Sequence, residues 1–494
     1  MGKNSSSVKK NFFYQMIYEV LVIILPFVTS PYIARVIGAE GLGIYSFSNS
    51  VAYYFVLVSM LGLKNYGNRT IASVRNDKEK LNETFSEIYV LHAIFSVICI
   101  AAYFVYCLEI SSDKKYALIQ TFYVVSSLFD ISWFYFGIEK FKLTVTRGIV
   151  IKILNAVCVF TFVKDGDDLW KYCLIMSLGM LLSQMSLWLP LRRYTRIVKP
   201  DTKNMYTHIK PMLILFIPAI AVSLYKYMDK IMIGGLSGKA QLGYYENAEK
   251  VNNIPITIIG SFGTVMLPKM SNLASKADKA VSRRYMAQSF QFVMMMAFAL
   301  AFGVASVGKP FSVIFWGDNF YLSGVIIMWL SVTIPFISFA NILRTQYLIP
   351  NRRDKEYTIS VMLGAVVNLL LNYILIPKYG AIGASYGTIA AEVTVCMIQT
   401  FSVRKELPLI QYTKSFIFFL FDGAVMFSAV YAETRILSVS IPNLVIEVAT
   451  GAAIYALLAL FYFVITKNEL FYSVKSNLMQ KLFKKKAVNH NEQT

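Results

Sequence analysis

Long apolar stretches separated by short polar connections fill this chain of 494 residues almost from end to end. A helix needs about 20 mostly apolar residues to cross the hydrocarbon core of a bilayer. The pattern predicts an all-α polytopic membrane protein with 14 transmembrane helices. A count of 12 or 13 stays open, because the fifth, seventh and eighth stretches are the least apolar. The predicted spans are residues 12–35, 43–63, 84–108, 116–138, 148–163, 169–190, 212–236, 244–267, 285–307, 321–343, 357–377, 383–401, 413–434 and 442–466.

Positive charge gathers in alternate connections and at both ends of the chain. Most of the 48 Lys and Arg residues lie there. Because cytoplasmic loops accumulate Lys and Arg, this alternation predicts that residues 1–11 and 467–494 are both cytoplasmic tails. The net charge of +20 is then explained by membrane orientation and by contact with anionic lipid, so no nucleic-acid partner is expected.

The connections are too short to hold a folded catalytic domain. The longest, at residues 64–83 and 191–211, lie on the expected cytoplasmic side. A stable domain needs considerably more chain than this. No nucleotide-binding loop and no catalytic set of side chains is apparent. The sequence therefore favours a transporter over an enzyme, and we expect no cofactor beyond a coupled sodium ion or proton.

Two hairpins carry matching sequences and indicate an internal repeat. The hairpin at residues 37–45 resembles the one at residues 233–245, with Gly43 and Gly243 in register, and Asn155 aligns with Asn368 in a weaker second match. Six spans per copy is an even number, so both copies insert the same way up and are related by an axis along the membrane normal. The expected division is an N-lobe at 12–190, an inter-lobe linker at 191–211, a C-lobe at 212–401 and an added helix pair at 413–466.

Several turn sequences resemble a known family. Residues 30–45, 227–234, 242–245 and 377–386 are similar to the Wzx-type polysaccharide flippases of the multidrug/oligosaccharidyl-lipid/polysaccharide (MATE-like) superfamily. The resemblance implies a flippase in the bacterial cytoplasmic membrane. Such a protein moves undecaprenyl-pyrophosphate-linked oligosaccharide repeat units for capsule, O-antigen or exopolysaccharide assembly, beside a polymerase and glycosyltransferases. A lipid II flippase and a multidrug or cation antiporter of the same superfamily are the alternatives.

Charged residues within the predicted spans are candidates for substrate binding, because buried charge usually faces a cavity or a partner. In the seventh and eighth spans the spacing places several of them on one helical face. The lysines could bind the substrate's pyrophosphate, or the two spans could be joined by ion pairs, and both interpretations stay open. The candidate cavity residues are Lys226, Lys230, Lys152, Arg35, Glu249 and Lys250.

A second set of polar residues suggests ion coupling. These residues supply the oxygen ligands that hard cations prefer, and their positions resemble the sodium site of the related lipid II flippases. Asn372 departs from that resemblance, since an acidic residue is expected there. Polar contacts between helices are the alternative explanation. The candidate coupling residues are Asp229, Asn368, Asn372, Thr388 and Glu392.

Overall fold

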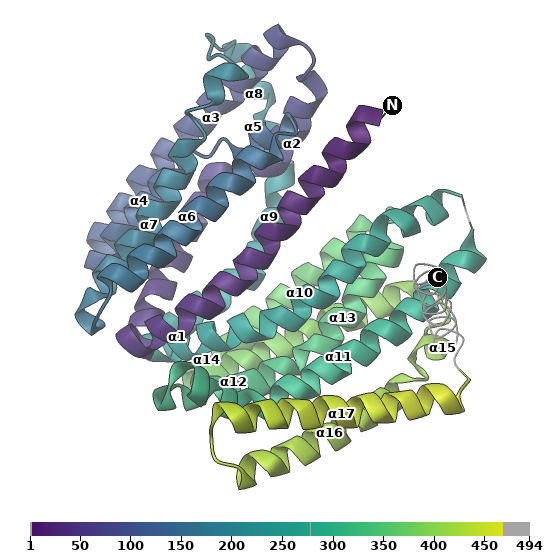
Figure 1. Cartoon of the computed structure of the whole chain (residues 1–494). Helices are drawn as coiled ribbons and strands as arrows, with labels where there is room; N and C mark the ends of the chain where they lie inside the picture. Colours follow the sequence, from purple (N-terminus) through teal and green to yellow (C-terminus); the bar gives the residue numbers. More distant parts are fainter. Residues whose placement is uncertain (1, 277, 468–494) are drawn as a thin grey trace, which may run out of the picture. The chain divides into compact units, whose positions relative to one another are not determined.

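The structure, a computed structural model, describes residues 2–276 and 278–467, and it describes side chains from residue 25 onward except at positions 218, 221, 222, 225 and 226. Every regular element in this part of the chain is helical (Figure 1). The α-helices are α1 (Gly2–Met60), α2 (Leu63–Val74), α3 (Lys78–Val105), α4 (Lys114–Leu128), α5 (Ser132–Gly137), α6 (Phe141–Phe162), α7 (Leu169–Ser186), α8 (Thr202–Thr207), α9 (Ile209–Leu236), α10 (Lys239–Ser275), α11 (Lys279–Trp316), α12 (Tyr321–Ser331), α13 (Thr333–Leu343), α14 (Asp354–Val403), α15 (Leu409–Thr413), α16 (Phe416–Ile436) and α17 (Ile441–Ile465).

Eleven helical segments of the described chain are long and apolar enough to cross a membrane. In a bilayer every backbone polar group must find its hydrogen bond within the protein, and a helix meets this requirement inside a single segment. The predicted all-α, multi-pass membrane class is therefore confirmed. Most of the basic tail expected at 467–494 lies outside the described residues.

Two helices run through predicted turns and are bent there by glycine. Gly38 in α1 has φ 70° and ψ −179°, and Gly380 in α14 has φ 59° and ψ −137°. These backbone conformations are accessible to glycine because it has no Cβ. Each glycine lies between two stretches that the hydrophobic pattern separates, so the predicted turns take the form of sharp breaks between nearly continuous helices.

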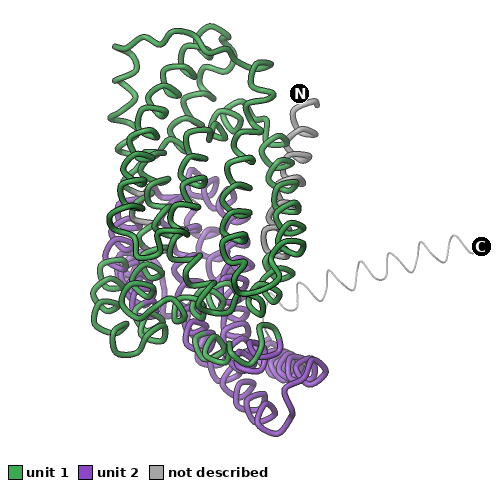
Figure 2. The backbone as a smooth tube through the Cα atoms, turned by 90° about the vertical axis from the view of Figure 1, so that its left-hand side faces the viewer, with its two compact units in different colours: residues 1–250, 315–326, 365–387 green, residues 251–314, 327–364, 388–494 purple. Residues whose placement is uncertain are grey.

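The chain packs into two compact units (Figure 2). The first unit contains residues 1–250, 315–326 and 365–387, and the second contains residues 251–314, 327–364 and the chain from 388 onward. Packing alone defines these units. The lobes expected at 12–190 and 212–401 stay a prediction.

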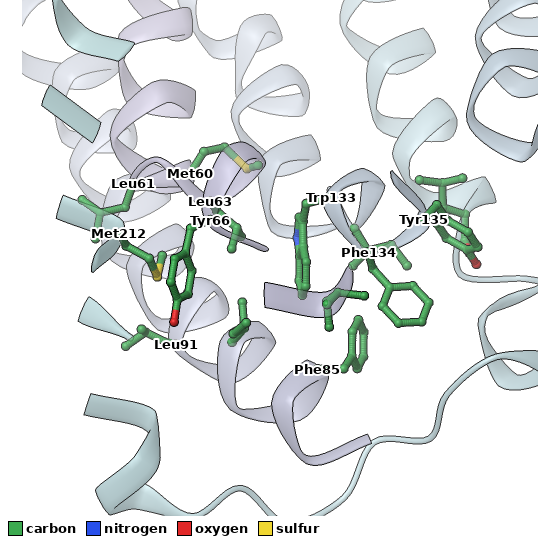
Figure 3. Packing of buried hydrophobic residues seen from close by; sticks show 14 of the residues in the cluster. Met60, Leu61, Leu63, Tyr66, Phe85, Leu91, Trp133, Phe134, Tyr135 and Met212 are labelled. Atoms are coloured by element: carbon green, nitrogen blue, oxygen red, sulfur yellow. The ribbon is translucent and has the colours of Figure 1, made fainter. Parts of the chain in front are cut away.

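An aromatic core joins the short helices of the first unit (Figure 3). The Phe85 ring stacks on Trp133 at a centroid distance of 5.6 Å and meets Phe134 at 4.9 Å. Helix α2 contributes Leu63 and Ile71, which are fully buried. The sequence pattern placed α2 in a connection, but its apolar face gives it a second role as part of the core.

The second unit has its own apolar core on α11, α13 and α15. There Phe290 packs against Phe339 at 4.8 Å between ring centroids and stacks on Tyr412 at 5.4 Å. Helices α16 and α17 lie side by side in the same unit (Figure 1). The Tyr455 hydroxyl of α17 donates a hydrogen bond of 2.7 Å to the Met295 carbonyl of α11, which fastens this helix pair to the unit.

The two matching hairpins pack against each other within the first unit. A Cβ on Gly43 would lie 1.7 Å from the carbonyl oxygen of Lys239, and a Cβ on Gly243 would lie 1.8 Å from the carbonyl oxygen of Ala39. The contact is reciprocal, since each glycine faces the residue four positions before the other. Only a residue without a side chain permits this approach of the two backbones.

We predict that Gly43→Ala and Gly243→Ala each destabilise the protein, because the added methyl group must push two helix backbones apart at a cost of about 1–3 kcal/mol. Thermal unfolding of the purified protein in detergent measures the loss. Gly235→Ala is the matched control, since a Cβ there meets no atom within 4 Å and alanine favours a helix. Equal melting temperatures for all three variants would contradict the prediction.

Candidate functional site

A layer of polar side chains crosses the first unit where the hydrophobic pattern predicts membrane. Its members come from α1, α9, α10 and the part of α14 that belongs to this unit. Polar and charged groups this deep in apolar surroundings are costly unless they are paired or hydrogen-bonded. This polar layer is therefore the candidate functional site.

An ion-pair lattice joins α9 to α10. The Lys230 ammonium lies 2.6 Å from a carboxylate oxygen of Glu246 and 2.9 Å from one of Glu249. Lys250 lies 3.6 Å from the other oxygen of Glu246. The Glu246 oxygen that Lys230 contacts also accepts a 2.9 Å hydrogen bond from the Ser46 hydroxyl of α1. Two cations thus meet two carboxylates. In this arrangement the charge of Lys230, whose side chain is 13% exposed, is matched within the protein.

Asp229 is the centre of a second group, formed with α10 and α14. One carboxylate oxygen accepts a 2.6 Å hydrogen bond from the Asn372 amide, and the other accepts one of 3.1 Å from the Tyr245 hydroxyl. The same Asn372 amide donates to the Asn368 side-chain oxygen at 3.2 Å. A carboxylate, two side-chain amides and a hydroxyl are therefore joined by hydrogen bonds at one buried place, and their oxygens are of the kind that hard cations prefer.

One polar atom of the Asn372 side chain is unsatisfied. Its side-chain oxygen is buried and has no hydrogen-bond partner among the described residues. A Cβ on Gly387 would lie 2.0 Å from that oxygen, so glycine at 387 leaves the space that the amide needs. An unpaired buried oxygen is an acceptor that a cation or a water molecule can satisfy.

Neighbouring residues on α9 reach different partners. The sequence spacing places Asp229 and Lys230 on one face, but consecutive residues of a helix point about 100° apart. Lys230 consequently reaches the carboxylates of α10, while Asp229 reaches Tyr245 and Asn372. Lys226 is the third predicted member of this face, and its side chain lies outside the described residues.

The other candidate residues stand apart from these two groups. Lys152, on α6, is half-buried, and within the described chain it has no hydrogen bond or ion pair. Arg35 is exposed on α1, with its side chain 3.9 Å from the Cβ position of Gly317. Thr388 and the buried Glu392 follow on α14 but belong to the second unit; both have interaction partners of their own.

Several members of the polar layer are not among the residues singled out from the sequence. Besides Ser46 and Tyr245, the layer contains Asn247, which is fully buried and whose side-chain oxygen lies 3.4 Å from the Ser30 hydroxyl. The signal that could have found them is the polar run at residues 244–250, which interrupts a span of otherwise membrane-like length. Among the described residues no group of three or more His, Cys, Asp and Glu side chains could hold a metal ion.

The fold has a solved counterpart. The structure "Lipid II flippase MurJ, inward closed conformation" matches 92% of this chain and 100% of its own, with a TM-score of 0.76 and 14% sequence identity. At this identity the likeness shows a shared fold and carries no information about the substrate.

Sequence relatives and the family give the more specific evidence. Proteins of Shigella dysenteriae and Escherichia coli K12, each named "Putative O-antigen transporter", are both 23% identical to this chain. The first match covers 80% of this chain and 100% of the relative, and the second covers 82% and 99%. Residues 8–274, more than half of the chain, match the family described as polysaccharide biosynthesis protein. The chain therefore belongs to the polysaccharide biosynthesis protein family.

Proposed function

We propose that this protein is a flippase that moves undecaprenyl-pyrophosphate-linked oligosaccharide repeat units across the bacterial cytoplasmic membrane. The observation that carries the proposal is the buried, charge-balanced layer of polar side chains within membrane helices of a polysaccharide biosynthesis family member. The names of the relatives point to O-antigen as the polymer. Capsule and exopolysaccharide units share the same lipid pyrophosphate chemistry, and a polymerase and glycosyltransferases are the expected partners.

We further propose 14 spans with both termini in the cytoplasm. Two of the eleven long helical segments, Leu25–Val74 and Asp354–Val403, have 50 residues each, which is far more than one crossing needs. The breaks at Gly38 and Gly380 divide them, and α9 adds a helix of 28 residues. The reciprocal glycine contact between the two hairpins supports a parallel repeat, because an axis along the membrane normal brings equivalent positions together.

The ion-pair lattice suggests how the protein neutralises the negative charge of the substrate. The substrate's pyrophosphate is negatively charged. To bind the lysines of the lattice, it must take the place of the carboxylates that neutralise them. We propose that Glu246 and Glu249 hold Lys230 and Lys250 until the phosphates compete for them. Lys152, which has no ion pair within the described chain, Lys226 and Arg35 are further cations that can contribute along the path. Exchange of one anionic partner for another avoids leaving a buried cation unpaired.

The Asp229 group is the proposed ion-coupling site. Its carboxylate and the oxygens of Asn368 and Asn372 offer ligands to a sodium ion, and the carboxylate alone offers a site for a proton. Either ion would neutralise Asp229 and weaken the hydrogen bond from Asn372 that ties α9 to α14. Thr388 and Glu392 remain candidates for a second part of the coupling pathway.

The flippase function predicts a specific defect. Deletion of the gene should abolish surface polymer while undecaprenyl-linked repeat units accumulate in the membrane, because synthesis continues and translocation stops. Extraction and mass spectrometry of the lipid fraction measure the accumulation, and the wild-type gene on a plasmid is the control. Normal polymer in the deletion strain, or peptidoglycan precursors accumulating in place of oligosaccharide units, would contradict the proposal.

A second prediction separates the pairing role of Lys230 from its proposed phosphate role. Lys230→Gln leaves two partly buried carboxylates short of a partner, and we expect a loss of roughly 3 kcal/mol in stability. The double variant Lys230→Gln/Glu249→Gln restores the charge balance, since Lys250 and Ser46 still contact Glu246. It should recover thermal stability and still fail to export polymer. Recovered export in the double variant would show that Lys230 acts only through its ion pairs.

A third prediction concerns coupling. Asp229→Asn keeps the shape of the side chain but removes its charge, and hydrogen bonds to a charged group are worth about 1.5–3 kcal/mol. We expect export to fall about tenfold or more and to lose its response to an imposed sodium or proton gradient in vesicles. Glu392→Gln, made separately, tests the second unit. An unchanged gradient response in the Asp229 variant would place the coupling site elsewhere.

A further inference from the structure

Five tyrosines of the first unit lie beside the ion-pair lattice or beside one another and take no part in the lattice. They come from α1, α4, α7 and α9, and each is half-buried. The Tyr53 and Tyr227 rings stack with their centroids 3.8 Å apart and an interplanar angle of 17°. The Tyr45 and Tyr172 rings meet edge to face at 4.8 Å. Tyr123 is close enough to interact electrostatically with both Tyr53 and Tyr227. We call these five residues the tyrosine surface.

The tyrosine surface adjoins the charged residues. Lys230 lies 5.7 Å from the centre of the Tyr227 ring. Glu246 interacts electrostatically with Tyr45 and with Tyr172. Tyr45 and Tyr53 are eight residues apart on α1, which corresponds to a rise of about 12 Å. The surface is therefore extended along the helices and begins at the residues proposed to meet phosphate.

The hydroxyl groups of these five residues differ from those of several more deeply bonded tyrosines of the same unit. Tyr103 donates a 2.9 Å hydrogen bond to the Ala117 carbonyl, and Tyr135 donates one of 2.6 Å to the Leu187 carbonyl. Tyr32 likewise donates to the Val163 carbonyl at 2.6 Å. Buried tyrosine hydroxyls usually find such partners.

None of the five hydroxyls of the tyrosine surface has a hydrogen-bond partner among the described residues. They are also absent from the fully enclosed unpaired polar atoms of the described chain, which belong to other side chains. The surface thus combines aromatic faces with accessible hydroxyls that can both donate and accept.

The aromatic faces and accessible hydroxyls together indicate which class of ligand the tyrosine surface fits. An apolar lipid tail would leave the hydroxyls unsatisfied, which is costly. A phosphate requires positive charge, which tyrosine does not supply. A sugar ring matches both features: its C–H face is apolar and carries slight positive charge, which suits the negative face of an aromatic ring, and its hydroxyls exchange hydrogen bonds with phenols. We propose that the tyrosine surface binds sugar rings of the translocated oligosaccharide, an inference that rests on the proposed flippase function.

The experiment compares two probes in nanodiscs: undecaprenyl pyrophosphate, and the same lipid carrying one N-acetylhexosamine. The double variant Tyr53→Leu/Tyr227→Leu removes the stacked pair. We expect it to bind the sugar-bearing lipid about tenfold more weakly and the bare lipid as well as the wild type does. Tyr53→Phe/Tyr227→Phe keeps the rings and loses only the hydroxyls, so its loss should be smaller. Tyr373→Leu, at a tyrosine that is 70% exposed on α14, is the control and should change neither affinity.

The outcomes separate the two proposals. The tyrosine surface does not recognise sugar if Tyr53→Leu/Tyr227→Leu binds both lipids like the wild type. The same conclusion follows if its affinity for both lipids falls by the same factor. Wild-type protein that binds the two lipids with equal affinity would overturn the inference as well, while leaving the flippase function intact. Wild-type protein that binds neither lipid would count against the flippase function itself.

Discussion

The cost of placing charge in apolar surroundings governs the polar layer of this protein. A lysine or carboxylate within a membrane helix is tolerated only beside a partner, a bound ion or a wet cavity. Lys230 lies within 3 Å of two carboxylates, and Asp229 accepts two hydrogen bonds. The helices that carry these residues are therefore tied together by electrostatics as well as by packing.

The close approach of the glycine hairpins makes this pairing possible. Gly43 and Gly243 lie three residues before Ser46 and Glu246, which is less than one helical turn. Because the backbones nearly touch at the glycines, the short Ser46 side chain can reach the Glu246 carboxylate at 2.9 Å. A bulkier residue at either hairpin would move α1 and α10 apart and break the polar contact as well as the apolar one.

The proposed substrate has two polar parts, and the first unit offers a different chemistry for each. Paired lysines can exchange their carboxylates for phosphate, and tyrosines with accessible hydroxyls suit sugar rings. The Asp229 group adds a place where an ion can change the link between α9 and α14. Charge balance before substrate arrives is consistent with a transporter, because strong fixed binding in one state would slow release in the next.

The sequence by itself determined the helical class, the positions of most membrane helices and the turns at Gly38 and Gly380. These follow from local properties, namely the length of the apolar stretches and the conformational freedom of glycine. It also placed Asp229, Lys230 and Asn372 correctly within helices. It did not recognise α2 as part of the core, since a short amphipathic helix looks like a polar connection.

Only the tertiary structure decided which groups meet. Asp229 and Asn372 are 143 positions apart, and Ser46 and Glu246 are 200 apart. Periodicity shows which face of a helix a side chain occupies, but it does not show which other helix covers that face. The identity of a partner depends on the packing of helices that are distant in sequence, so the lattice and the tyrosine surface became visible only in three dimensions.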